Sequence, residues 1–436
     1  MKLFLPPLQF AHKFCCILVK KALCLYLVIA APHLFGMPED SGLTPTTAVN
    51  IATRDNPNLA AMQARYEALT LVPSQVNSLP DPTINLNAMN FPTDTLSRGQ
   101  EPMTQVQIGF SQMLPFPGKL GLKQQVAEYE SQTVGHGLEE ATLQLIKNVK
   151  TRWWQLYYLD RALETVTLSQ TLLRQFITVA KTKYETGKGL QQDLLLSQLE
   201  LSKLLDREIQ LHALRRNHSI QLSLLMDRPV DTEIVLSNSI SKWLPDLLNI
   251  EELYQKAELN RPRLKQMESK VEAAQSRLDL AQRNRYPDFK LAMNYGERSA
   301  GRSDFVSVMV GVKIPLYAGS KQSKAISQKS LELVKTRHVS RNETGLIMAS
   351  ISSAITDYQR AKQQFSLFGS GIVPQAQQTV ASMLAGYQVS EVDFLNLVRS
   401  QITLFNYELR YWKALSDAKA ALAHIEAAVG EESIYE

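Results

Sequence analysis

Four segments of the chain alternate apolar and polar residues with the period of a β-strand. They cover residues 82–90, 104–114, 287–296 and 305–315. Such alternation predicts a strand with one apolar and one polar face. Taken singly, each strand fits an ordinary sheet with one face on a core. Strands of about ten residues also suit an outer-membrane barrel, in which the outer face is apolar and the inner face is polar.

Long helices are predicted around these strands. Residues 119–186 contain no proline, and a helix of that length would extend about 100 Å. A second helix is predicted to return over 190–226, and two more over 320–388 and 392–429. Residues 46–77 are predicted to form one helix before the first strand. Helices as long as these need partners along their length, as in coiled coils.

Glycine and proline mark the predicted turns and breaks. In "YETGKGLQQD", the chain is expected to turn with positive φ at Gly187 and Gly189. In "GSGIVPQ", Gly369, Gly371 and Pro374 predict a break in the third long helix.

The second half of the chain repeats the first. Pro57 aligns with Pro262 and Pro82 with Pro287 at one offset, and "YETG" later matches "YQVS" at nearly the same offset. A constant offset predicts the same order of elements in each half. The chain is therefore divided into a signal peptide at 1–36, a first repeat at 37–230, a linker at 231–247, a second repeat at 248–430 and a tail at 431–436.

Both halves contain a junction between strand and helix. "QMLPFPGK" in the first half matches "VKIPLYAGSK" in the second. Proline cannot extend a strand ladder, and glycine allows the backbone to change direction. We therefore expect Gly118 and Gly319 to occupy equivalent backbone positions, and Lys119 to begin its helix near the lipid headgroups. The predicted junction residues are Pro115, Pro117, Gly118, Pro315 and Gly319.

The N-terminal segment predicts export. Lys20 and Lys21 precede the apolar run "ALCLYLVIAA", which is too short to span a bilayer; a buried helix is the alternative. Cys15, Cys16 and Cys24 are the three cysteines, so the mature chain would have neither a disulfide nor a thiol. Loss of the segment would lower the formal charge from +5 to about +1. The mature chain would then lack the excess of positive charge that is typical of a nucleic-acid-binding protein.

The number of strands favours an oligomer. Four strands cannot close a barrel, and lipid does not tolerate open sheet edges. Two copies would give about eight strands and little lumen, whereas three would give about twelve strands and an open interior.

The order of these elements resembles the TolC family of trimeric outer-membrane efflux ducts. The duplicated plan, "IVPQAQQTVASMLAGYQ" and the ending "VDFLNLVRSQITLFNYELRYWKALSDAKAALAHIEAAVG" carry the resemblance, which covers the mature chain. "LPDPTINLNAMNFP" and "LPFPGKLGLKQQVA" look more like the branch that serves heavy-metal pumps of the resistance-nodulation-division (RND) class.

The resemblance implies a mainly α fold with a pair of transmembrane β hairpins. It implies a homotrimer with a 12-stranded β-barrel in the outer-membrane lipid of a Gram-negative bacterium and a long α-helical tunnel in the periplasm. It further implies docking to a periplasmic adaptor and an inner-membrane RND pump.

The resemblance also implies a gate at the closed periplasmic tip. Tyr387 falls on the latch tyrosine of the family, and Asp193 falls on its acidic partner. The two acids that ring the pore in the family fall on Asn396 and Arg399, so an acidic constriction is not carried over. Val392 stands in place of the arginine that links to the latch.

Two further acids and the helix turns complete the candidate sites. Glu391 and Asp393 lie close by in the sequence and are candidates to replace the ring acids. Adaptor docking in this family involves the helix turns, which here carry Tyr184, Gly187, Leu190, Gly386, Tyr387 and Ser390.

The sequence predicts a channel and no enzyme. It has no glycine-rich phosphate loop and no G-x-S-x-G motif. Its seven histidines are scattered, so no metal site is predicted, and no cofactor is expected. We expect passive conduction of heavy-metal cations or drugs. A duct for type I protein secretion and a periplasmic coiled-coil scaffold without a pore are the alternatives.

Overall fold

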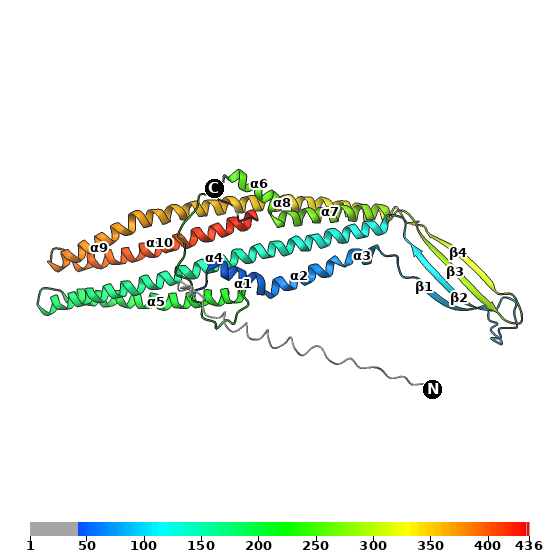
Figure 1. Ribbon diagram of the computed structural model, residues 1–436, viewed down its shortest axis with the longest axis horizontal. Coiled ribbons are helices and arrows are strands. Elements are labelled where there is room, and N and C mark those ends of the chain that lie inside the picture. The colour runs from blue at the N-terminus through cyan, green and yellow to red at the C-terminus, as the bar shows by residue number, and fades with distance from the viewer. Residues whose placement is uncertain (1–41, 433, 436) are drawn as a thin grey trace, which may run out of the picture.

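The computed structural model describes residues 42–432, 434 and 435. The predicted signal peptide lies outside these residues. The molecule is a long rod with a β-sheet at one end and two helix turns at the other (Figure 1). Among the described residues, no helix combines the length and apolar character that a membrane span requires.

The first repeat is built from short helices, two strands and a long helical hairpin. Its elements are α1 (Pro45–Asp55), α2 (Pro57–Thr70), α3 (Val72–Asn77), β1 (Thr83–Met89), β2 (Gln105–Leu114), α4 (Lys119–Glu185) and α5 (Gln191–Leu225).

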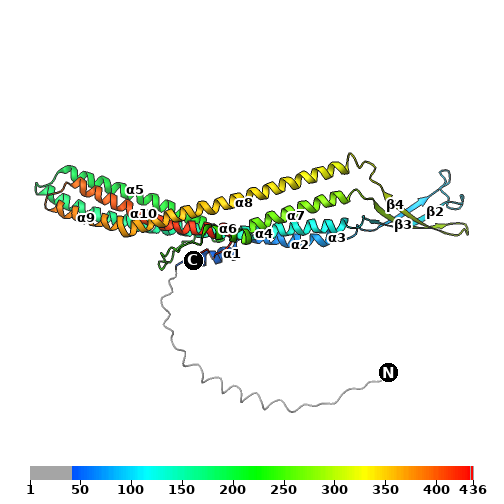
Figure 2. The same cartoon turned by 90° about the horizontal axis from the view of Figure 1, so that it is seen from above.

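The second repeat follows the same order. Its elements are α6 (Ile250–Asn260), α7 (Pro262–Arg283), β3 (Asp288–Arg298), β4 (Phe305–Lys313), α8 (Gln322–Leu367), the π-helical turn η1 (Phe368–Ile372), α9 (Val373–Gln388) and α10 (Phe394–Val429). Helices α4, α7 and α8 run side by side toward the sheet (Figure 2).

The single helix predicted over 46–77 is wrong, because the segment forms three helices. The side chain of Asn56 accepts hydrogen bonds from two backbone amides at the start of α2, and Pro57 is the first residue of that helix. Pro73 stands in the first turn of α3. Proline lacks a backbone N–H and is tolerated best in a first turn, so each proline marks a new helix start.

The break predicted between Gly369 and Pro374 is also wrong. The backbone stays helical from α8 through η1 into α9. A Cβ added to Gly369 would lie 3.0 Å from the Tyr411 ring, so this glycine allows α10 to approach closely. Pro374 falls in the first turn of α9. The wider π turn absorbs both residues without opening a loop.

The four strands form one antiparallel sheet in the order β1-β2-β3-β4. Hydrogen-bonded neighbours place apolar residues beside apolar residues across all four strands. One such row contains Leu86, Ile108, Tyr295 and Val306. Within this chain β1 and β4 are the edge strands.

The sheet has its faces reversed relative to a soluble protein. Leu86 is 77% exposed and Val308 is 68% exposed, whereas Gln105 and Gln107 on the opposite face are 6% and 8% exposed. An apolar face turned outward and a polar face turned inward is the arrangement of an outer-membrane barrel wall.

Conventional cores hold the middle of the rod together. Ala48 of α1 packs in one cluster with Trp153 of α4 and Leu415 of α10. Leu253 of α6 packs in a second cluster with Ile351 of α8. The short first helix of each repeat is therefore fixed against the long helices, halfway between the two ends.

Candidate functional site

The α4–α5 and α9–α10 turns lie together at the tip of the rod (Figure 1). In the first turn, the amide of Lys188 donates to the carbonyl of Lys183 at 2.8 Å. At the equivalent positions of the second turn, the amide of Glu391 donates to the carbonyl of Gly386 at 2.9 Å. Both helices therefore end in the same Schellman-type turn.

The left-handed residue of this turn differs between the repeats. Gly187 has φ of 71°, and its equivalent Ser390 has φ of 65°. Gly189, which we expected to share this conformation, does not have positive φ. A serine in this region costs backbone energy that a glycine does not. The Ser390 hydroxyl accepts a hydrogen bond from Lys183 Nζ at 2.9 Å, which offsets part of that cost.

In each turn, a glycine lies against a larger side chain, and the two positions are reversed between the turns. A Cβ added to Gly189 would lie 2.9 Å from Cβ of Lys183. At the equivalent positions, a Cβ added to Gly386 would lie 2.6 Å from Cγ2 of Val392. Each turn thus pairs a glycine with a larger residue, in opposite order. Gly386, a predicted docking residue, has a packing role at the tip.

Lys183 connects the two repeats at the tip. Its Nζ donates to the backbone carbonyl of Tyr387 and to Ser390, and lies 4.4 Å from the centroid of the Tyr387 ring. Lys183 was not among the residues predicted from the sequence. The signal that could have identified it is the alignment of the repeats, in which Lys183 aligns with Gly386.

Tyr387 is the buried member of a pair of equivalent tyrosines. It is 4% exposed and packs against Phe394, whereas Tyr184 is 45% exposed. Burial raises the pKa of Tyr387 to about 12, and the nearby Asp193 carboxylate adds to this rise. The hydroxyl makes no hydrogen bond of standard geometry within the described part of the chain. Its interaction with Asp193 is therefore mainly electrostatic.

Asp193 lies in the first turn of α5 and is half-buried. Burial raises the pKa of this carboxyl group, and the carboxylate of Asp393 raises it further. Tyr387 and Lys183 oppose this rise. The structure therefore brings together a carboxyl group, an ammonium group and a phenol from both repeats.

The other predicted gate residues lie around the second turn. Asn396 is the repeat equivalent of Asp193, because the amide of each donates to the residue three positions earlier at 3.1 Å. The exposed members of the predicted gate are Glu391, Asp393, Asn396 and Arg399. The exposed members of the predicted docking set are Tyr184, Gly187, Leu190 and Ser390.

The junction at the other end of the rod also joins the two repeats. Gly118 has φ of 87°, and α4 begins directly after it. The amide of Phe116 donates to the Asp288 carboxylate at 2.9 Å, and Lys119 Nζ donates to the same oxygen at 2.8 Å. The Phe116 ring stacks on Tyr286 with centroids 4.6 Å apart. The first residues of α4 are thereby fixed to the start of β3.

Lys119 begins α4 as predicted. The residue is only 5% exposed, and its ammonium group is held by Asp288 and by the carbonyl of Tyr286. A buried ammonium group is stable only with such partners. Lys119 therefore fixes the junction from inside, and the level of this helix start relative to the lipid headgroups stays a prediction.

The expected equivalence of Gly118 and Gly319 is wrong. Gly319 does not have positive φ, and α8 begins only at Gln322. The second junction is longer than the first, and the amide of Lys321 donates to the carbonyl of Tyr317 at 2.9 Å within it. The extra residues make the turn without a left-handed glycine. Pro115, Pro117 and Pro315 lie just after the strands, as proposed for residues that end a ladder.

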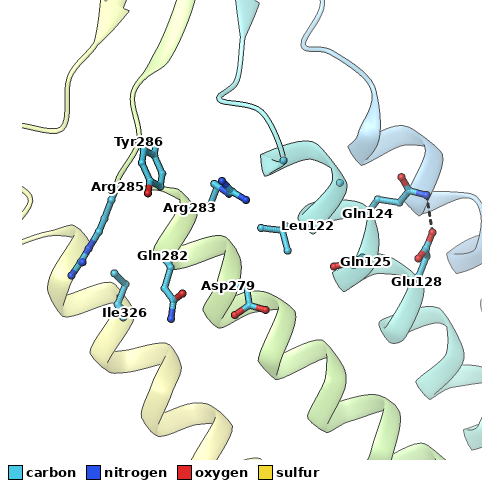
Figure 3. Close-up of a pocket in the computed structure, with 12 residues that line it drawn as sticks. Leu122, Gln124, Gln125, Glu128, Asp279, Gln282, Arg283, Arg285, Tyr286 and Ile326 are labelled. Atoms are coloured by element: carbon cyan, nitrogen blue, oxygen red, sulfur yellow. Dashed lines mark hydrogen bonds between the residues drawn. The ribbon is translucent and has the colours of Figure 1, made fainter.

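A polar hollow of about 1190 Å³ lies beside the first junction, between α4 and α7 (Figure 3). Charged side chains of both signs line it, including Glu128, Asp279 and Arg283. The Gln124 amide donates to Glu128 at 2.7 Å. A surface lined by these polar and charged side chains suits contact with water.

Within residues 42–432, 434 and 435, no cluster of three His, Cys, Asp or Glu residues could hold a metal ion.

A lipid-facing sheet that continues into long helices with two closely packed turns defines a TolC-like outer-membrane channel. The family model described as outer membrane efflux protein matches residues 48–227 and 253–431, one match in each repeat. The chain belongs to this family. It is a channel protein of the outer membrane with a periplasmic tunnel, and it is not an enzyme.

Solved structures of outer-membrane channels share the fold. The outer-membrane channel OprN has 14% identity and a TM-score of 0.76, with 88% of this chain and 89% of that chain covered. VceC of Vibrio cholerae has 14% identity and a TM-score of 0.75, with 89% and 96% covered. CusC has 14% identity and a TM-score of 0.75, with 90% and 93% covered. No curated protein matches the sequence.

Proposed function

We propose that this chain is the outer-membrane duct of a tripartite efflux system and works as a homotrimer with a periplasmic adaptor and an inner-membrane RND pump. The observation that carries the proposal is the reversed sheet, whose strand β2 leads through the short junction at residues 115–118 into α4. A helix of 67 residues extends about 100 Å. One chain therefore supplies both a strip of membrane wall and a long strip of tunnel wall.

The proposed duct is passive. The pump supplies the energy, and adaptor contacts at the exposed turns favour an open arrangement of the tip helices. Opening is then a shift of population between closed and open states. Tyr184, Leu190 and Ser390 are the docking residues in this proposal.

Conductance tests the channel itself. Purified protein reconstituted in planar lipid bilayers should give discrete conductance steps, and native mass spectrometry should give a trimer. A folded monomer that is extracted without detergent and conducts no ions would contradict the proposal and favour the scaffold.

The proposed gate is the contact of Tyr387 with Asp193, with Lys183 holding the two turns together. Tyr387→Phe combined with Asp193→Ala should raise the open probability in bilayers. Tyr184→Phe is the matched control, because this tyrosine is the exposed equivalent. Unchanged conductance in the double variant would exclude the gating role.

We propose heavy-metal cations or drugs as the cargo. Residues 79–92, which include β1, and residues 114–127, which follow β2, support the heavy-metal branch by their resemblance. Asn396 and Arg399 do not attract cations, so selectivity for a cation would come from Glu391 and Asp393, which are exposed at the same turn, or from the pump. A deletion strain should become sensitive to copper, silver or cobalt salts or to drugs. A secretion defect with unchanged sensitivity would favour a type I duct.

A further inference from the structure

The sheet has two edges that the chain itself does not cover. Among the described residues, β1 and β4 are each paired on one side only. Leu316 and Tyr317, just after β4, are 81% and 75% exposed. Unpaired strand edges are not tolerated in lipid. If the proposed trimer is correct, β4 of one copy pairs with β1 of the next copy.

We propose the register of this seam: Lys313 of one copy lies opposite Asn85 of the next. The faces of the strands supply the first argument. Lys313 and Asn85 both belong to the polar face, whereas Ile84 and Leu86 belong to the apolar face. A shift by one residue would turn a whole strand over, so only Thr83, Asn85 and Asn87 are candidates for the partner of Lys313.

The internal duplication supplies the second argument. The β2–β3 pairing within the chain is the template for the seam, and in it Met113 lies opposite Lys290. The prolines that flank the strands align the two repeats. Alignment of Pro115 with Pro315 places Met113 on Lys313, and alignment of Pro82 with Pro287 places Lys290 on Asn85. The template pair therefore predicts that Lys313 lies opposite Asn85.

The hairpins leave two competing registers. Asn85 pairs with Gly109 in the first hairpin, whereas Lys290 pairs with Gly311 in the second, two residues beyond the aligned position. Aligning the repeats on the hairpins in place of the prolines sets Lys313 opposite Asn87 if the two residues are assigned to β4, or opposite Thr83 if they are assigned to β1. The proline alignment gives the register between these two, with Lys313 opposite Asn85.

Closure of the barrel excludes one competitor. If Lys313 faces Asn85, the row of paired residues from Leu86 to Val306 reaches β1 of the next copy about six residues beyond Leu86. Three copies then give a shear of roughly 18 residues, and with ~3.3 Å per residue and ~4.8 Å between strands the tilt is about 46°. The Asn87 register gives a shear of roughly 24 and a tilt of about 54°, and the Thr83 register gives a shear of roughly 12 and a tilt of about 35°. Membrane barrels tilt by about 35–45°, which excludes Asn87. The proline alignment favours Asn85 over Thr83.

The same register completes the second junction with a residue of the neighbouring copy. Within the chain, the Asp288 carboxylate accepts a hydrogen bond from the amide of Phe116. The aligned positions are Thr83 and Leu316. The Thr83 hydroxyl of the next copy would therefore lie beside the exposed Leu316 segment, whose amide donates to the Ile314 carbonyl at 3.0 Å within the chain.

Cysteine cross-linking in the full chain in outer membranes tests the register. All three cysteines lie in the predicted signal peptide, so the mature chain provides no thiol background. Lys313→Cys with Asn85→Cys should give disulfide-linked trimers on non-reducing gels, at least several-fold more than the matched pairs. Those pairs combine Lys313→Cys with Thr83→Cys or with Asn87→Cys. They share the face but lie two residues along the strand, where Cα atoms are about 8 Å apart, beyond the ~7 Å that a disulfide bridges.

Each result decides a different point. Strongest cross-linking in the Asn85 pair supports the register. Strongest cross-linking in the Thr83 or Asn87 pair overturns the register and leaves the trimer intact. Absence of cross-linking in all three pairs, with a monomer in native mass spectrometry, overturns the trimer and with it the proposed function. Absence of cross-linking in a protein that is trimeric overturns the register alone.

Discussion

At the scale of single residues, backbone conformation separates glycines that look alike in the sequence. Gly187 and Gly319 both lie in connections between two elements, and both have open space around them. Only Gly187 has positive φ, at 71°. The conformational freedom of glycine is therefore needed at Gly187 and not at Gly319.

This difference predicts opposite outcomes for two identical substitutions. Gly187→Ala should destabilise the α4–α5 turn by about 1 kcal/mol, because alanine is strained at this φ. Hydrogen exchange of the Lys188 amide should then become about fivefold faster. Gly319→Ala is the control and should leave the exchange of the Lys321 amide unchanged. Equal effects at both sites would contradict the assignment.

The pKa of Asp193 predicts how pH affects the tip. Burial raises this pKa in the structure, and in the proposed open state the carboxyl group would return to water. The closed tip then binds the proton more tightly, so its advantage is present at low pH and is lost as the pH rises through the raised pKa. Tyr387, with a pKa of about 12, stays protonated throughout.

Bilayer conductance should therefore fall as the pH is lowered through the titration of Asp193. Asp193→Asn should remove this dependence, because the amide does not titrate. Glu391→Gln, at an exposed position, is the control and should retain it. A pH profile that is the same in Asp193→Asn and in the wild type would show that another group controls the tip.

At the scale of elements, the junction is a contact between repeats. The start of α4 is held by the start of β3, about 170 residues later in the chain. The prolines and Gly118 could be predicted from the sequence, because their effect on the backbone is local. Asp288 and Tyr286 could not, because nothing local shows which distant segment will pack there.

Lys119→Met should destabilise the protein by about 1–3 kcal/mol, because it leaves the partly buried Asp288 carboxylate without its cation. Adding Asp288→Asn should recover part of the loss, since the uncompensated charge is removed. Lys123→Met, four residues along on the exposed side of α4, should change stability by less than about 0.5 kcal/mol. Thermal dissociation of the assembled protein in detergent measures all three. Additive losses in the double variant would contradict the pairing.

At the scale of the whole molecule, the two ends follow opposite solvation rules. Around the middle and at the tip, apolar side chains are buried in ordinary cores. In the sheet, the apolar side chains are exposed and the glutamines are covered. One chain therefore combines a segment built for lipid with a segment built for water.

This reversal predicts which exposed residues tolerate charge. Val308→Lys should cost about 2–4 kcal/mol in each copy, because it places an ammonium group in hydrocarbon. The adjacent Ser307→Lys, on the polar face, should be tolerated. The amount of assembled protein in isolated outer membranes measures both effects. A tolerated Val308→Lys would contradict a membrane location for this face.

The sequence by itself determined the types of element, their order and their duplication. Strand alternation, helix length and proline positions act over a few residues, so one chain is enough to read them. Only the tertiary structure decided that Tyr387 is buried while Tyr184 is exposed, and that Lys183 and Lys119 each join one repeat to the other. These facts depend on contacts between segments roughly 170–200 residues apart. Two nearly identical motifs acquire different environments because each packs against a different neighbour.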